Sequence, residues 1–236
     1  MKIYNISPTL PDTPAWERAH WGPSNGWLLE EGPDGKPQHN EDFDQIIADV
    51  PQDMALGINL ERSSGTWEYL NYDLHPQDSV RIREELVDRI NFLRPDLKLF
   101  LYLMPDHVGQ ATRDPQRWLS YIAERELANR GVTTGLTWGS TTGYWKNDFT
   151  ESGWVNWKRR QDLALSLIDT VHIKQPIAFI WDRMDQWRDP MPYWAFNKVL
   201  RYYEDRDVTV AFWSPYAYPR PIRWEAQMLL WKYSQA

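Results

Sequence analysis

The chain alternates short apolar runs with longer segments in which apolar residues recur at helical spacing. The apolar runs, rich in β-branched and aromatic residues, predict strands at 54–61, 97–104, within 133–149, 176–182 and 208–213. The periodic segments predict helices at 78–94, about 115–129, about 153–171, 190–204 and 222–233. Strands and helices that alternate in this way are typical of βαβ units and a parallel sheet.

The first 50 residues are less regular, with possible strands in "KIYNIS" and "GWLLE" and a short helix at 41–49. No repeat, low-complexity tract or charge block divides the chain. We therefore expect one domain over 1–236, with residues 1–50 as its irregular N-terminal part.

Each predicted strand has an aliphatic side and a side that becomes polar or aromatic toward its carboxyl end. In 54–61 the aliphatic side is Met54, Leu56, Ile58 and Leu60, and the other side is Ala55, Gly57, Asn59 and Glu61. The same division separates the leucines from Phe100 and Tyr102 in 97–104, and Val208, Val210 and Phe212 from Thr209, Ala211 and Trp213. The change to polar and aromatic residues toward the carboxyl end predicts an α/β fold: a (β/α) TIM-like barrel open at its carboxyl-terminal rim. The absence of a GxGxxG or P-loop motif argues against an open nucleotide-binding sheet.

Asn59 and Glu61 are two residues apart, so they belong to the same face of one strand and are expected at the barrel mouth. A carboxyl group among aromatic rings there is expected to have a raised pKa, which suits a general acid for glycosidic cleavage. The alternative is that Glu61 only pairs with Arg62 or caps the following loop.

Aromatic residues make up 14% of the chain, including 15 Trp and 12 Tyr. Besides filling a core, such rings can stack on the C–H faces of sugars when they stand on loops. Four segments with Gly, Pro, Ser or Asn beside their rings read as loops: "WGPSNGW", "TWGSTTGYW", "ESGWVNW" and "FWSPYAYP". The composition is compatible with carbohydrate binding.

Charge and residue usage exclude several other classes. A net charge of −7 argues against a nucleic-acid partner. No apolar run is long enough for a membrane span, and the N-terminus does not read as a secretory signal, so we expect synthesis in the cytoplasm, with virion association or another export route open. The five His are dispersed, there is no Cys and no GxSxG motif, and no metal or cofactor is expected.

The stretches "MALGINLERSSGTWEYL" and "LRPDLKLFLYLMPDH" resemble the bacterial and phage-associated relatives of the hyaluronidase family, which are barrel glycosidase-like proteins. Later segments fit the same plan, among them "PIAFIWDRMD" and "IRWEAQMLLW", so that the resemblance covers about residues 50 to 233. It implies a distorted barrel of about seven strands that acts on an N-acetylated polysaccharide or similar glycan.

Position by position, the resemblance places Glu61 as proton donor, Trp213 as a rim residue that contacts sugar, and Tyr102 as the aromatic one strand on. Tyr144 and Trp145 correspond to the family's mid-barrel tyrosine, in a loop that does not align cleanly. The family's first carboxylate is Asn59 here. In substrate-assisted cleavage that carboxylate positions the acetamido group; an amide can hydrogen-bond this group but carries no charge, which puts the mechanism or the activity in question.

Another carboxylate could serve, since Asp106, Asp148, Asp182 and Asp185 all follow predicted strands. Asp182 and Asp185 are best placed, because they lie between Trp181 and Trp187. If one of them faces Glu61, a two-carboxylate mechanism becomes possible, retaining at about 5 Å separation and inverting at about 6.5 to 9.5 Å. Alternatively, both carboxylates are loop caps paired with Arg183 or Arg188.

The sequence thus favours a glycoside hydrolase, with candidate catalytic residues Glu61, Asn59 and Asp182. We expect a carbohydrate substrate to be bound by Trp67, Tyr102, Tyr144, Trp145, Trp181, Asp185, Trp213 and Tyr216. The alternative, which Asn59 favours, is a barrel of the same ancestry that binds glycan without cleaving it, as part of a larger assembly such as a phage particle. A muramidase-like lysozyme barrel is the third possibility and meets the same objection at Asn59.

Overall fold

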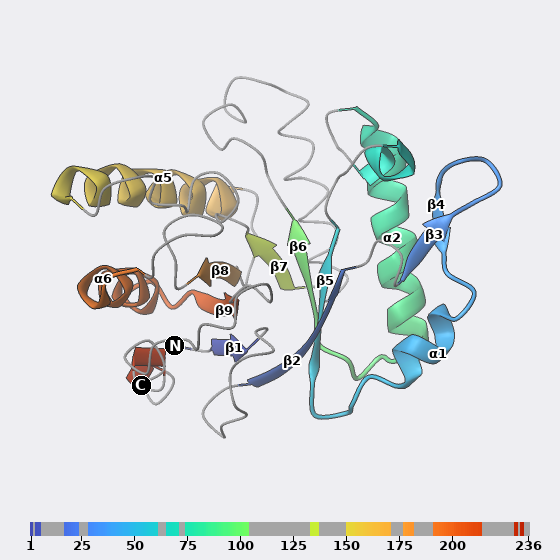
Figure 1. The fold of residues 1–236 in the computed structure, drawn as a ribbon, viewed down its shortest axis with the longest axis horizontal. Helices are drawn as coiled ribbons and strands as arrows, with labels where there is room; N and C mark the ends of the chain where they lie inside the picture. Colours follow the sequence, from blue (N-terminus) through green and yellow to red (C-terminus); the bar gives the residue numbers. More distant parts are fainter. Residues whose placement is uncertain are drawn as a thin grey trace.

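The computed structural model describes residues 1, 3–5, 17–23, 28–60, 65–70, 74–103, 133–136, 150–170, 177–181, 191–213, 229–230 and 232–233. Within these ranges, seven strands form a closed, parallel ring (Figure 1). In ring order they are β1 (Ile3–Asn5), β2 (Glu17–Pro23), β5 (Ala55–Asn59), β6 (Leu99–Leu103), β7 (Thr133–Leu136), β8 (Ile177–Trp181) and β9 (Thr209–Trp213). β1 pairs with both β2 and β9, which closes the ring.

Helices cover the ring on two sides (Figure 1). α1 (Phe43–Ala48), the 3₁₀ helix η1 (Gly65–Leu70) and α2 (Pro76–Leu93) lie on the side of β5, and α5 (Glu151–Thr170) and α6 (Tyr193–Glu204) lie on the other side. α2 begins with Pro76, whose fixed φ suits the first helical turn, and ends two residues before Pro95. Its buried residues recur at helical spacing and give it one apolar face.

The buried side chains form two clusters between strands and helices. Leu56 and Ile58 of β5 pack with Leu86 and Ile90 of α2 in the first cluster. The second cluster contains Val210 and Phe212 of β9, Phe196 and Leu200 of α6, and Trp157 of α5. The aliphatic side predicted for 54–61 and 208–213 is therefore confirmed as the side that packs on helices. The opposite side of the strands is buried as well. Ala55 of β5, Ile177 of β8 and Ala211 of β9 are buried but belong to neither cluster.

An antiparallel hairpin stands apart from the ring, beyond α2 (Figure 1). It consists of β3 (Leu29–Glu31) and β4 (Pro37–His39). The turn is closed by a hydrogen bond of 2.7 Å from the Gly32 amide to the Lys36 carbonyl oxygen. Gly35 has a φ of 76°, a conformation that glycine adopts without steric cost.

The sequence expectations for the first 50 residues and for α5 have different outcomes in the structure. The strands expected in "KIYNIS" and "GWLLE" are confirmed as β1 and β3, with β3 in the hairpin, whereas the ring strand at 17–23 was not predicted. The helix expected at about 153–171 is confirmed as α5, and its start at Glu151 makes the segment "ESGWVNW", also read as a loop, helical. The helix expected at 41–49 is confirmed as α1.

The (β/α) TIM-like class itself stays a prediction. It requires a helix after each strand, and residues 104–132, which include the helix expected at about 115–129, lie outside the described residues. Of the helix expected at 222–233, the structure describes helical residues at 229–230 and 232–233.

Candidate functional site

The candidate site predicted from the sequence is the barrel mouth, by which we mean the edge of the ring formed by the carboxyl ends of its strands. Asn59, the last residue of β5, is in register with Tyr102 of β6 and with Pro23 of β2. Trp181 of β8 is in register with Trp213 of β9. Because all ring strands are parallel, these strand ends share one edge. Four positions chosen from the sequence therefore come to the same edge of the ring.

Other predicted site residues lie outside the described part of the chain. They are Glu61, Tyr144, Trp145, Asp182, Asp185 and Tyr216, and the further candidates Asp106 and Asp148 lie outside it as well. Glu61 lies two residues after the end of β5 at Asn59 and four residues before the start of η1 at Gly65. The structure describes both of these elements.

Trp67 is the predicted site residue whose side chain the structure places. It lies on η1, is partly buried and packs against the cluster formed by β5 and α2. At least part of its indole surface therefore stabilises the fold on this side of the ring.

Three polar contacts hold η1 in place. Leu70, its last residue, has a carbonyl oxygen that accepts hydrogen bonds from Ser79 Oγ at 2.9 Å and from Arg83 Nη2 at 3.0 Å. Both α2 side chains are buried. At the other end, Thr66 Oγ1 donates to the Glu31 carboxylate of the hairpin. The segment that follows Glu61 is thus held by both α2 and the hairpin, a support that the sequence pattern did not reveal.

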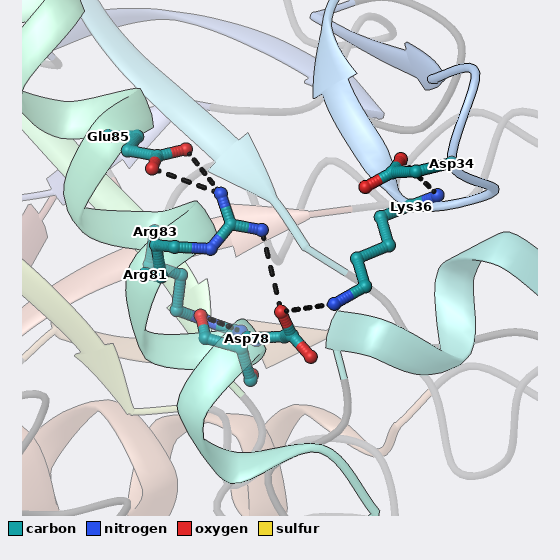
Figure 2. Close-up of polar contacts among 7 residues, drawn as sticks. Asp34, Lys36, Asp78, Arg81, Arg83 and Glu85 are labelled. Atoms are coloured by element: carbon teal, nitrogen blue, oxygen red, sulfur yellow. Dashed lines mark hydrogen bonds and ion pairs between the residues drawn. The ribbon is translucent and has the colours of Figure 1, made fainter.

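The hairpin also contacts α2 through an ion pair (Figure 2). Lys36 Nζ lies 3.0 Å from Asp78 Oδ1, and this contact holds the pKa of the Asp78 carboxyl below its ordinary value. Within α2, Arg81 Nη1 donates to both carboxylate oxygens of Glu85, at 3.0 and 2.9 Å. These pairs are partly exposed, so each contributes less than about 1 kcal/mol to stability.

We expect His39 of the hairpin to make the fold sensitive to mild acid. Burial lowers the pKa of His39 below its ordinary value of 6.5, and the nearby Glu85 carboxylate only partly opposes this shift. As pH falls below 6.5, the unfolded chain binds this proton before the folded chain does, so the contribution of His39 to stability is present above 6.5 and is lost on acidification. In urea unfolding at pH 7.5 and pH 5.5, His39→Gln should lose less stability than the wild type; an equal loss would contradict this assignment.

Aromatic side chains gather where α5 and α6 pack side by side. We call Trp154, Trp157, Trp194 and Tyr202 the aromatic band. Trp154 stacks on Trp157 with ring centroids 5.1 Å apart, and Trp157 meets Tyr202 edge to face. Lys198 Nζ lies 5.3 Å from the Trp154 ring and 5.6 Å from the Trp194 ring, and it pairs with Glu151 at 3.0 Å.

The exposed end of this band lies on the mouth side. α6 begins near the carboxyl end of β9, because the Phe196 ring near its start meets the Phe212 ring edge to face, with centroids 6.0 Å apart. Tyr193 is 54% exposed and Trp194 is 42% exposed, both in the first turn of α6. Trp157, one turn further along α5 than Trp154, is buried in the core.

Neither a metal site nor a membrane span emerges from the described ranges. In them, no group of three or more His, Asp or Glu side chains is arranged to hold a metal ion. The helices placed in the same ranges include none that is long and apolar enough to cross a bilayer.

No protein-family model matches the chain, and no curated protein matches it.

Proposed function

We propose that the chain is a (β/α) TIM-like barrel glycoside hydrolase that acts on a polysaccharide or other glycan, with Glu61 as the general acid. The observation that carries the proposal is the shared edge of the strand ends at 59, 102, 181 and 213. An amide, a tyrosine and two tryptophans at the carboxyl-terminal edge of a parallel ring are residue types that hydrogen-bond and stack on sugars. The resemblance to hyaluronidase relatives supports the same proposal.

In this proposal Glu61 donates its proton to the oxygen of the leaving sugar as the glycosidic bond breaks. The anomeric carbon is then attacked in one of two ways. The acetamido oxygen of an N-acetylated sugar attacks it while Asn59 hydrogen-bonds that group, or a carboxylate such as Asp182 or Asp185 activates water or attacks directly. Neither route needs a cofactor.

The second candidate function is glycan binding without cleavage, as a component of a larger assembly such as a phage particle. Asn59 favours it, because the amide at this position cannot supply the negative charge that a carboxylate would. The exposed Tyr193 and Trp194 on the mouth side support glycan contact in either case.

Incubating the purified chain with a panel of polysaccharides, and measuring both new reducing ends and binding, separates the two functions. The panel should contain glycans with and without N-acetylated sugars. The hydrolase proposal expects new reducing ends from at least one member. Binding to a member with no new reducing ends would select the second function, and neither binding nor cleavage would contradict both.

A further inference from the structure

The β3–β4 hairpin contacts η1 as well as α2. Lys36, in the turn of the hairpin, places its Nζ 3.0 Å from Asp78 Oδ1 of α2 and 5.2 Å from the centre of the Tyr69 ring of η1. An ammonium group over an aromatic ring is attracted by the negative face of that ring. One side chain of the hairpin is therefore shared by α2 and by η1.

A second residue of the hairpin contacts the other end of η1. Thr66, the second residue of η1, donates a hydrogen bond from Oγ1 to the carboxylate of Glu31, the last residue of β3. Near the far end, the Tyr69 ring packs against the His75 ring just before α2 begins, with centroids 4.3 Å apart. Because η1 is only six residues long, these contacts restrain it near both of its ends.

The placement of η1 restricts the segment that precedes it. Leu60, directly after β5, is buried, and Gly65 is the first residue of η1. The short connection between these two points carries Glu61. A connection that is fixed at both ends has fewer conformations than one that is fixed at a single end. Contacts that hold η1 therefore reduce the number of positions open to Glu61.

The same contacts contribute little to the stability of the whole fold. The Lys36 side chain is 33% exposed, that of Asp78 is 24% exposed, and the hydrogen bond between Thr66 and Glu31 is exposed as well. Exposed ion pairs and hydrogen bonds add little to the free energy of unfolding. We therefore expect their removal to loosen η1 without unfolding the protein, so that the two effects can be measured separately.

We infer that Glu31 and Lys36 are positioning residues, which hold Glu61 at the barrel mouth by fixing η1. This inference rests on the proposed function, in which Glu61 is the general acid. Proton donation requires the acid to lie within hydrogen-bond distance of the leaving oxygen, and a misplacement of about 1 Å can cost as much as a hundredfold in rate. Neither hairpin residue touches the substrate, so the hairpin affects the rate of the chemical step and not the affinity for the glycan.

A double-mutant cycle on the full chain tests this inference, with a panel polysaccharide that the wild type cleaves. Lys36→Met removes the ammonium group and keeps the length of the side chain. It should lower kcat about fivefold, the rate equivalent of one partly exposed ion pair, and leave KM unchanged. In the Glu61→Gln background the same substitution should have no further effect, because no proton remains to be positioned. A purely structural role would lower the rate in both backgrounds.

The remaining variants separate the contact with η1 from the chemistry of the substitution. Glu31→Ala should lower kcat as Lys36→Met does, and Lys36→Arg, which keeps the cation, should restore most of the rate. Lys158→Met and Glu30→Ala are the matched controls, because Lys158 pairs with Asp162 within α5 and Glu30 bonds to Gln38 within the hairpin. Both controls should keep the wild-type kcat, and thermal melting should show that every variant is folded.

The outcomes distinguish this inference from the proposed function. An unchanged kcat in both hairpin variants, or the same loss of rate with and without Glu61, would overturn the positioning role and leave Glu61 as the acid. A loss of equal size in the matched controls would overturn it as well. No cleavage by the wild type, or a wild-type rate in Glu61→Gln, would contradict the proposed function and the positioning role together.

Discussion

Replacing Glu61 with Gln is expected to lower the rate of reducing-end release by about 10²- to 10⁴-fold, the usual contribution of a general acid. Gln has nearly the same shape but no acidic proton to give to the leaving oxygen. Binding of the same polysaccharide should survive, because an amide can still hydrogen-bond hydroxyl groups. The measurement is reducing-end release under saturating substrate, combined with a binding titration of the same variant.

Glu68→Gln is the matched control for this experiment. Glu68 lies on η1, seven residues after Glu61, and its side chain is exposed. The control should keep the wild-type rate. If Glu61→Gln also keeps it, Glu61 is not the proton donor, and a carboxylate such as Asp182 or Asp185 becomes the next residue to substitute.

Replacing Leu86 with Ala is expected to destabilise the fold by about 2–5 kcal/mol, the usual cost of removing a large buried aliphatic side chain. Leu86 is fully buried where α2 packs on β5. The substitution removes apolar contacts from this packing and leaves a cavity. For a chain of this length, such a loss lowers Tm by roughly 4–20 °C. Urea unfolding and thermal melting both measure it.

Leu74→Ala is the same substitution at a side chain that is 59% exposed, shortly before α2. It should change stability by no more than about 0.5 kcal/mol. Equal losses for the two variants would contradict the placement of Leu86 in the core. That result would also remove the support for assigning the aliphatic side of β5 to the helical layer.

Strands with clear alternation could be predicted closely. The run at 54–61 became β5 (Ala55–Asn59), and the run at 208–213 became β9, because Leu56, Ile58, Val210 and Phe212 carry the packing signal in the sequence itself. The same alternation brought Asn59 and Trp213 to the candidate site. Their location at one edge of the ring follows from parallel pairing of strands.

β2 could not be predicted in this way. Its sequence, ERAHWGP, lacks β-branched residues and ends on Gly and Pro, so it reads as a turn. It is a strand because it pairs along its length with β5, from Ala19 opposite Ala55 to Pro23 opposite Asn59. Tertiary pairing overrides local propensity here.

The start of α5 carried two conflicting signals. The apolar spacing predicted a helix from about 153, whereas Gly153 beside Trp154 suggested a loop. Thr150 Oγ1 accepts a hydrogen bond of 3.1 Å from the Gly153 amide and caps the helix. A threonine three residues before that glycine was the available signal. The ion pair between the hairpin and α2 had no such signal, because Lys36 and Asp78 are far apart in the sequence and meet only in the folded chain.

The closure of the ring has a consequence for how the protein is made. Ile3 pairs with Val210, and its side chain packs in the cluster that α5, α6 and β9 provide. A ribosome that synthesises the chain from its N-terminus therefore releases β1 long before its second neighbour exists. Until β9 emerges, the nascent barrel has an open seam, where a chaperone or another nascent chain can pair with the unfinished edge.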